Sequence, residues 1–368
     1  MDTRTVEPET MFFEENQIRA LNTVETSAAF SYSMAEQGRV DITKSIHCLV
    51  SPILKAQAGE VCCLLDYRQY TVPRACFLGV VGKLQLAGQI ARAAAIFRID
   101  EIVVYDDSEK SARLSAKSRK WSECAADTGS AFLARLLQFL ETPQYLRKSL
   151  YTMHTSLKYA GMLPPIDPPH HLRQSEWLPY REGVVLEKRP DDGGSFVNVG
   201  IIKDVRISQF IKAGTRVTVA MGEDSNYKRL FGKKLKAVPP TDPREKTGLY
   251  WGFSVRLAPS LSAVFTECPF EDGYDHIIGT SEHGEQPNSA DLEIPYFRHL
   301  LVVFGGVTGL EHSLKEDNSL EVEEVSYLFD RYLNVCPDQG SRTIRTEEAI
   351  LIALQYLQNP IQRACSRR

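Results

Sequence analysis

The chain has 368 residues, of which 43% are hydrophobic and 24% are charged, and its formal net charge is −4. This length and composition predict a globular protein with a large core and more than one domain. No apolar run approaches the roughly 18 residues of a membrane helix, and the acidic first twenty residues lack the apolar segment of a secretory signal, so neither membrane contact nor secretion is expected.

The eight cysteines are spread along the chain without the CxxC spacing that zinc sites use. Only Cys62 and Cys63 are neighbours, and adjacent cysteines rarely hold one metal ion or bridge to each other. The cysteines therefore predict reduced thiols in a nuclear or cytoplasmic protein. No metal site is predicted.

The first half of the chain contains one weakly patterned part and one clearly patterned part. Residues 1–69 show little periodicity and are interpreted as a poorly specified N-terminal segment. Within 70–163, apolar residues recur at helical spacing over 84–98, a buried-strand run follows at 101–105, and a second amphipathic helix is predicted over 132–140. A helix that feeds a buried strand is the repeating unit of an α/β sheet, so this part is assigned to an α/β domain.

A cluster of prolines around residue 166 predicts a break that leads into an inserted domain over 164–256. Short β runs separated by glycine turns predict a small β-barrel in this insert, similar to the oligonucleotide-binding (OB) fold. The predicted strands are 183–187, 195–199, 204–207, 215–220 and 250–257.

The middle of the insert is basic. Nine Lys or Arg residues and only three acidic residues lie between Lys203 and Lys236, which leaves a local charge of about +6. Phosphate contact requires such a local basic face whatever the overall charge, although an ordinary solvated strand face is the alternative. The candidate nucleic-acid contacts of this segment are Lys228, Arg229, Lys233 and Lys234.

The α/β pattern returns over 257–368. The apolar run 300–304 predicts a buried parallel strand that ends in Gly305 and Gly306. A final helix is predicted from Thr346, its expected N-cap, with acidic residues in its first turn. Its expected buried stripe comprises Ile350, Leu351, Leu354 and Leu357.

Three loops follow β-like runs in this last part of the chain, at 279–284, 305–311 and 336–346. Ligands of open α/β sheets bind beyond the carboxyl ends of the strands, so these loops are expected to converge on one pocket. Glycines there would let main-chain groups approach a ligand closely, although an ordinary turn is the alternative for Gly305 and Gly306 alone. No dinucleotide, phosphate-loop or hydrolase motif accompanies the loops.

Many runs of residues, in one order over about three quarters of the chain, resemble the SPOUT class of α/β trefoil-knot RNA methyltransferases. The branch in question includes the animal kinetochore-associated SPOUT-domain methyltransferase. The matching runs are 86–95, 100–105, 142–148, 169–174, 180–185, 195–200, 248–258, 261–265, 272–281, 298–306 and 340–352. The front of the chain departs from the family, because relatives place a strand after a Tyr-Thr-Val segment that here runs directly into Pro73.

The resemblance implies a deep knot in the C-terminal part of the α/β domain, which binds S-adenosylmethionine and forms a homodimer interface. It also implies an OB-type insertion. The implied cofactor residues are Thr280, Ser281, Gly305, Gly306, Asn334, Gly340 and Thr343. They also include His283, at a position where close relatives carry an arginine.

Methyl transfer from a sulfonium depends on in-line alignment more than on an acid or a base. We expect Arg342 and Arg345 to hold a phosphate or a base carbonyl, with surface ion pairs to neighbouring glutamates as the alternative. If the target is a uridine, its ring nitrogen must lose a proton, and Asp272 could assist. A turn stabilised by aspartate side chains is the alternative for the segment 272–275.

The resemblance implies methylation of a base, with uridine favoured, in ribosomal or other structured RNA. The protein is expected in the nucleus, nucleolus or cytoplasm, and at the spindle or kinetochore in mitosis. A different function is a catalytically silent RNA-binding scaffold at the spindle or kinetochore that keeps the knot for dimerisation. Retention of Gly305, Gly306 and the segment 340–348 favours the enzyme, because a scaffold would not need them.

Overall fold

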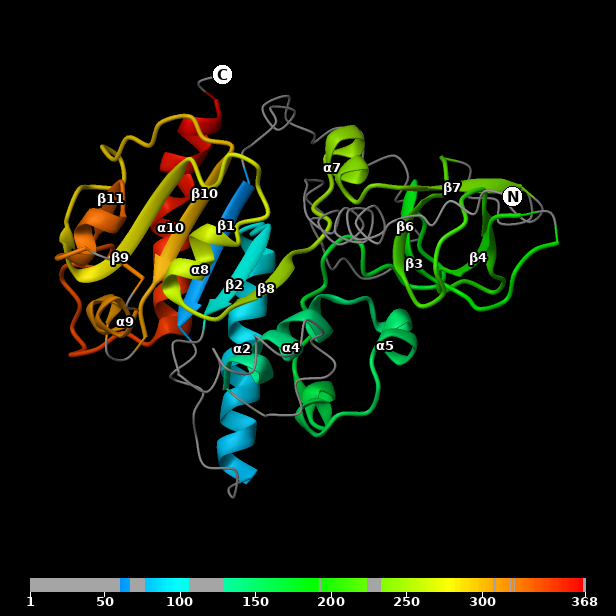
Figure 1. The fold of residues 1–368 in the computed structure, drawn as a ribbon, viewed down its shortest axis with the longest axis horizontal. Helices are drawn as coiled ribbons and strands as arrows, with labels where there is room; N and C mark the ends of the chain where they lie inside the picture. Colours follow the sequence, from blue (N-terminus) through cyan, green and yellow to red (C-terminus); the bar gives the residue numbers. More distant parts are fainter. Residues whose placement is uncertain are drawn as a thin grey trace, which may run out of the picture. The chain divides into compact units, whose positions relative to one another are not determined.

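The computed structural model describes residues 60–66, 77–105, 129–191, 193–223, 233–306, 309–317, 319–320 and 322–366. They divide into two compact units. The first, which we call the sheet unit, combines the described residues of Ala58–Asp167 and Phe253–Arg368. The second, the barrel unit, is Pro168–Gly252. In the sequence, the barrel unit is inserted between the two segments that form the sheet unit, as the colours of Figure 1 show.

The sheet unit contains a six-stranded parallel sheet in the order β11-β9-β10-β1-β2-β8. Parallel pairing requires crossover connections, and the helices that provide them bury both faces of the sheet. The strands are β1 (Glu60–Asp66), β2 (Glu101–Tyr105), β8 (Ser254–Ala258), β9 (His276–Glu285), β10 (His299–Phe304) and β11 (Arg331–Leu333).

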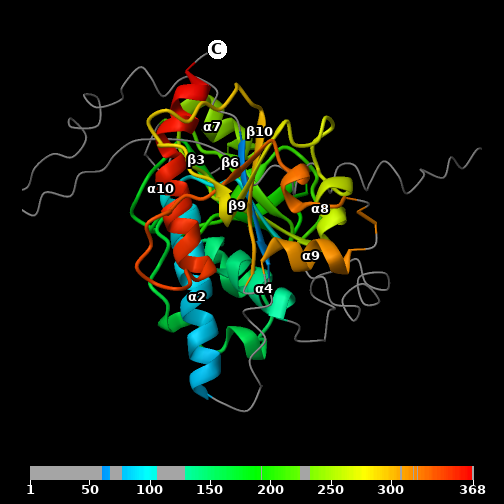
Figure 2. The same ribbon diagram turned by 90° about the vertical axis from the view of Figure 1, so that its left-hand side faces the viewer.

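Three longer helices form the core on one face of the sheet: α2 (Phe77–Ile96), α4 (Gly129–Glu141) and α10 (Thr346–Cys365). The short helices α8 (Leu261–Thr266), α9 (Leu310–Glu316) and η7 (Val325–Leu328) cover the other face. Figure 2 shows α10 and α2 on one side of the strands and α8 and α9 on the opposite side. The remaining helical segments of this unit are α5 (Gln144–Leu150), η5 (Thr155–Leu157) and η6 (Ala160–Met162).

The segment 1–69, interpreted as poorly specified, contains β1, which occupies a central position in the sheet. β1 pairs with β10 on one side and β2 on the other, and Val61, Cys62 and Cys63 are buried. The carboxylate of Asp100 fixes the strand entry by accepting a 2.6 Å hydrogen bond from the amide of Val61. Pro73, where the sequence departs from the family pattern, lies outside the described residues.

Most of the strongly apolar elements expected in this unit are confirmed. β2, α4, β10 and α10 lie where the apolar patterns predict them, and α2 begins earlier than expected. Two details are wrong. Leu351 is 38% exposed and does not belong to the buried stripe of α10. Thr346 is the first helical residue of α10 and not its N-cap, which is Arg345.

The barrel unit contains a closed five-stranded barrel in the order β3-β4-β5-β7-β6 (Figure 1). Its pairs are antiparallel except that of β5 with β7, and a five-stranded Greek-key barrel is the architecture of the OB fold. The strands are β3 (Tyr180–Val185), β4 (Ser195–Asn198), β5 (Val205–Ile207), β6 (Arg216–Ala220) and β7 (Lys234–Val238), and the helix α7 (Thr241–Thr247) follows them.

The expected barrel is therefore confirmed, but one of its strands is misassigned. The run 250–257 leads into β8, which belongs to the parallel sheet, whereas β7 in the basic segment closes the barrel. Valine, isoleucine and methionine side chains fill the barrel interior. On the other face of β3, the fully buried carboxylate of Glu182 accepts hydrogen bonds from Arg216 Nε (2.7 Å) and Trp251 Nε1 (2.6 Å).

Among the helices of the described residues, none combines the length and hydropathy that a bilayer-spanning segment needs.

Candidate active site

The carboxyl end of β9 leaves the regular sheet ladder and forms a bulge. In β11, Tyr332 pairs with Gly279, but the next residue, Leu333, pairs with Glu285. The residues between these partners, 280–284, therefore form an excursion that a regular ladder would not contain, and bulges of this kind re-aim side chains near active sites. The expected loop 279–284 lies within β9: Gly279 and Thr280 still pair with β10, and the register with β11 shifts after Gly279.

The chain that leaves β11 lies directly against this bulge. Asn334 donates to the carbonyl of Glu282 through Nδ2 (3.0 Å) and to that of Glu285 through its amide (2.7 Å). A Cβ atom on Gly284 would lie 2.4 Å from the main-chain carbon of Leu333. Only glycine fits this close approach of two backbones.

The end of β10 forms the second wall of the site. Gly305 follows β10, and a Cβ atom there would lie 3.1 Å from the amide nitrogen of Leu310 at the start of α9. The hydroxyl of Thr346 donates a 3.1 Å hydrogen bond to the Gly305 carbonyl, which ties the start of α10 to the end of β10. The three predicted loops thus converge at the carboxyl edge of the sheet, as expected from its parallel strands.

Two polar residues that the sequence analysis did not select lie next to this site. Tyr332 Oη donates to Glu311 Oε1 at 3.2 Å and also contacts the Ser281 hydroxyl. Burial raises the pKa of Tyr332 to about 12, an effect that the Ser281 hydroxyl opposes and the Glu311 carboxylate reinforces. Glu311 also approaches Gly309, whose φ of 77° favours glycine. In the sequence, the only feature that pointed to Glu311 as a site residue was its place at the end of a glycine-rich loop.

The proposed cofactor residues differ in how their side chains are used. The Thr280 hydroxyl donates to the Val303 carbonyl (2.8 Å) and so holds β9 to β10, while His283 is exposed beside Glu282. Gly340 and Thr343 lie in the segment that connects β11 to α10. There the Ser341 hydroxyl bridges the amide and carbonyl of Thr343.

The two candidate arginines have different surroundings. Arg345 donates its amide to the Glu348 carboxylate (3.0 Å), and its guanidinium lies 3.9 Å from the Glu347 carboxylate. Arg342 is exposed and makes no side-chain ion pair or hydrogen bond with the residues that the structure describes. The alternative of a surface ion pair thus applies to Arg345, whereas Arg342 remains available for a ligand.

Asp272 does not lie near Arg342 or Arg345 of the same chain. This corrects its assignment as a base beside those two residues. It pairs with Arg298 (2.8 Å) just before the amino ends of β9 and β10. About five strand residues separate this end from the bulge, or roughly 17 Å. Gly273 has a φ of 71° and donates its amide to the carbonyl of Phe270, so the chain turns just before β9.

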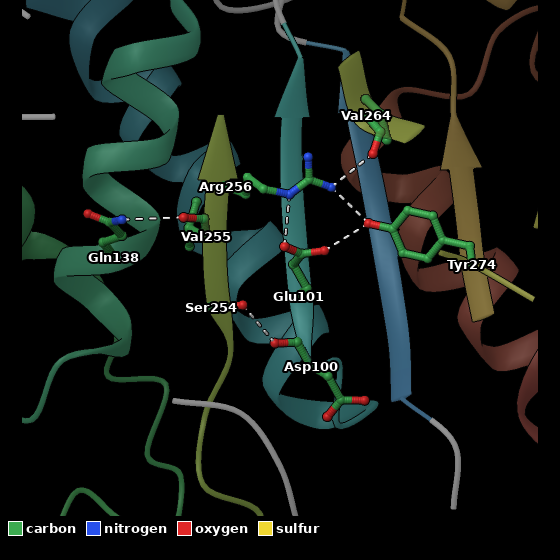
Figure 3. A network of polar contacts seen from close by, with 8 residues as sticks. All are labelled: Asp100, Glu101, Gln138, Ser254, Val255, Arg256, Val264 and Tyr274. Atoms are coloured by element: carbon green, nitrogen blue, oxygen red, sulfur yellow. Dashed lines mark hydrogen bonds and ion pairs between the residues drawn. The ribbon is translucent and has the colours of Figure 1, made fainter. Parts of the chain in front are cut away.

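A network of polar contacts anchors that turn (Figure 3). The Tyr274 hydroxyl donates to Glu101 Oε2 (2.9 Å) and accepts from Arg256 Nη2 (2.8 Å). Arg256 Nε donates to the other Glu101 oxygen at 3.0 Å. Asp275 accepts the amides of two residues at the start of β10. The acidic residues here have structural partners.

Two of the four predicted RNA contacts lie outside the described residues, namely Lys228 and Arg229. Lys233 and Lys234 are exposed, and Lys234 begins β7 of the barrel.

Comparisons with known proteins agree on one family. The family described as "Putative RNA methyltransferase" matches residues 81–357, more than half of the chain. The chain is 51% identical over 290 residues to the 28S rRNA (uridine-N(3))-methyltransferase of Homo sapiens, a match that covers 77% of this chain and 74% of the relative. It is 49% identical to the Mus musculus protein of that name (77% and 72% covered) and 47% identical to the Drosophila melanogaster one (75% and 58% covered).

The match spans both units and includes β9, β10 and the segment from β11 into α10. The resemblance read from the sequence is confirmed at this level. The chain belongs to this family of RNA methyltransferases.

Proposed function

We propose that this protein transfers a methyl group from S-adenosylmethionine to N3 of a uridine in large-subunit ribosomal RNA. The observation that carries the proposal is the identity of 47–51% with three relatives named as 28S rRNA (uridine-N(3))-methyltransferases. The convergence of the β9 bulge, Gly305 and the segment before α10 supports a ligand site at the expected edge of the sheet.

The groups at this edge fit the cofactor chemically. Main-chain groups beside Gly305 and Gly306, the hydroxyl of Ser281 and the carboxylate of Glu311 offer donors and acceptors for ribose hydroxyls and an adenine edge. A carboxylate also favours a nearby positive charge. We assign these residues, together with Asn334, to cofactor binding. When bound, the cofactor supplies an electrophilic methyl group.

The proposal includes the trefoil knot and a homodimer through it. The close approach of Gly284 to the chain between Leu333 and Asn334 supports a tight crossing of two segments. The connection from β11 also leads from an edge strand to α10, which packs against β10 and α2. Leu351, 38% exposed on α10, is the apolar side chain that we assign to the subunit contact.

The chemistry sets clear requirements on the residues of this chain. Uridine N3 must lose its proton to solvent before its electron pair can form a bond to the methyl carbon, while the methyl–sulfur bond breaks and S-adenosylhomocysteine leaves. The site must therefore stabilise a base anion. The Arg342 guanidinium can do so by donating to a uracil carbonyl, because its planar fork matches such acceptors. Positioning of N3 in line with the methyl group then provides much of the rate enhancement.

A nucleolar or cytoplasmic location follows from an RNA substrate of this kind and remains a prediction, as does association with the spindle or kinetochore. A catalytically silent scaffold gains no support from the three relatives, each of which is named as an enzyme.

The proposal can be tested by incubating the full chain with ribosomal RNA and labelled S-adenosylmethionine. Digestion to nucleosides and mass spectrometry should detect 3-methyluridine, and Arg342→Ala should form it much more slowly. The assignment would be overturned if the product were a different methylated nucleoside. It would also be overturned if no methylated nucleoside formed on RNA taken from cells that lack the protein.

A further inference from the structure

The barrel unit is the basic part of an acidic protein. Residues 168–252 contain fifteen Lys or Arg and ten Asp or Glu, a formal charge of +5 within a chain of −4. A local charge of this sign attracts a polyanion. Charge alone does not say which side chains meet the bases of a bound nucleic acid.

The outer face of the barrel presents an aromatic ring in a row with cations. Phe196 points outward from β4, because its neighbours Ser195 and Val197 are buried. It pairs directly with Arg206 of β5, which in turn pairs with Lys234 of β7. Directly opposed residues of neighbouring strands lie about 5 Å apart, so ring, guanidinium and ammonium share one face.

A second ring, Phe210, follows β5 in the chain, and its neighbours are tied to β4 and β7. Gln209 exchanges two hydrogen bonds with the backbone of Ala237 in β7 (2.7 and 3.0 Å). Ile211 donates its amide to the Ser195 hydroxyl of β4 (3.0 Å). The backbone on both sides of Phe210 is thus fixed, and yet 67% of Phe210 is exposed.

A cation lies over each of the two rings. Lys188 Nζ lies 5.4 Å from the centroid of Phe196, and Arg189 Cζ lies 5.0 Å from that of Phe210. Both cations come from the connection between β3 and β4. A ring beside a cation suits a nucleotide, whose base stacks on the ring while its phosphate meets the charge.

We propose that Phe196 and Phe210 form a stacking platform for unpaired bases of the RNA substrate, flanked by Lys188, Arg189 and Lys234. This inference rests on the proposed function only in taking RNA as the substrate. A duplex would hide its bases from the rings, so the platform selects single-stranded or looped RNA. An apolar protein segment would bury the rings but would make no use of the positive charge around them.

Fluorescence anisotropy with labelled oligouridylate and the full chain tests the platform. Phe210→Ala and Phe196→Ala should each weaken binding by between about 5- and 100-fold, the range of one lost base stack. Phe210→Trp, unlike Phe210→Ala, should bind oligouridylate about as tightly as the wild type. The slope of log K against log salt should not change for Phe210→Ala, because stacking releases no counterions. Tyr327→Ala, at an aromatic residue of the sheet unit that is 73% exposed, is the matched control and should bind normally.

The same variants should bind an abasic oligonucleotide and a duplex RNA as the wild type does. Unchanged binding of oligouridylate by both alanine variants would overturn the inference and leave the rings to a protein partner. An equal loss on all three probes would also overturn it, because the rings would then only shape the barrel. A wild type that binds as expected but forms no 3-methyluridine would refute the proposed function and not this platform.

Discussion

The contact between Gly284 and the chain leaving β11 leads to a sharp prediction about Gly284→Ala. The added methyl group would lie 2.4 Å from the carbonyl carbon of Leu333 and 2.7 Å from the amide nitrogen of Asn334. Both are backbone atoms, so no side-chain rotation can relieve the clash. Overpacking typically costs about 1–3 kcal/mol, and we expect a value near the upper end.

Gly340→Ala is the matched control, because it makes the same chemical change in the same site. A methyl group there would meet no atom within 4 Å, and the residue has no positive φ. Its unfolding free energy should change by no more than about 0.5 kcal/mol. Urea titrations followed by far-ultraviolet circular dichroism measure the stability of both variants, and calorimetry with S-adenosylhomocysteine should show weakened binding for Gly284→Ala. Equal stability of the two variants would refute the close crossing of the backbones.

Three further predictions concern single residues. Arg342→Ala should lower kcat by about 100-fold with little change in S-adenosylhomocysteine affinity. Arg345→Ala should lower kcat less, because the Arg345 guanidinium already faces a glutamate. Equal effects of the two substitutions on kcat would contradict these roles. Glu182→Gln should destabilise the barrel unit by about 3 kcal/mol, since Arg216 would lose its buried counter-charge, and an unchanged tryptophan-fluorescence melting curve would rule this out. Burial lowers the pKa of His276, although nearby aspartates oppose the shift, so the folded state disfavours the protonated ring. The wild type should therefore lose stability as the pH falls below about 6.5, and His276→Gln should lack this component of the pH dependence in urea titrations.

The parts of the fold that were predicted correctly are those in which one physical signal dominates. α4 and α10 carry a continuous apolar stripe, and β10 is an uninterrupted apolar run, so burial alone identifies them. β7 was missed because its exposed lysines alternate with Leu235 and Ala237, which resembles a solvated basic segment. β8 was recognised as a strand but placed in the wrong sheet, because strand periodicity does not identify the partner strands.

The candidate site was predicted in outline for a different reason. Gly305, Asn334 and the residues before α10 follow strands whose carboxyl ends must meet at one edge if the sheet is parallel. Asp272 was misplaced because it precedes β9, and the two ends of a strand lie at opposite edges. Glu311 and Tyr332 were missed because only the folded chain brings them together.

The central place of β1 has a practical consequence for work on this protein. The family match begins at residue 81, so a recombinant fragment cut to that match would lack the strand between β10 and β2. Both strands would then have unpaired main-chain groups in the middle of the sheet, a template for aggregation. Fragments intended for crystallisation or enzymology should therefore start before Glu60, and a poorly behaved shorter fragment would say nothing about the catalytic competence of the intact chain.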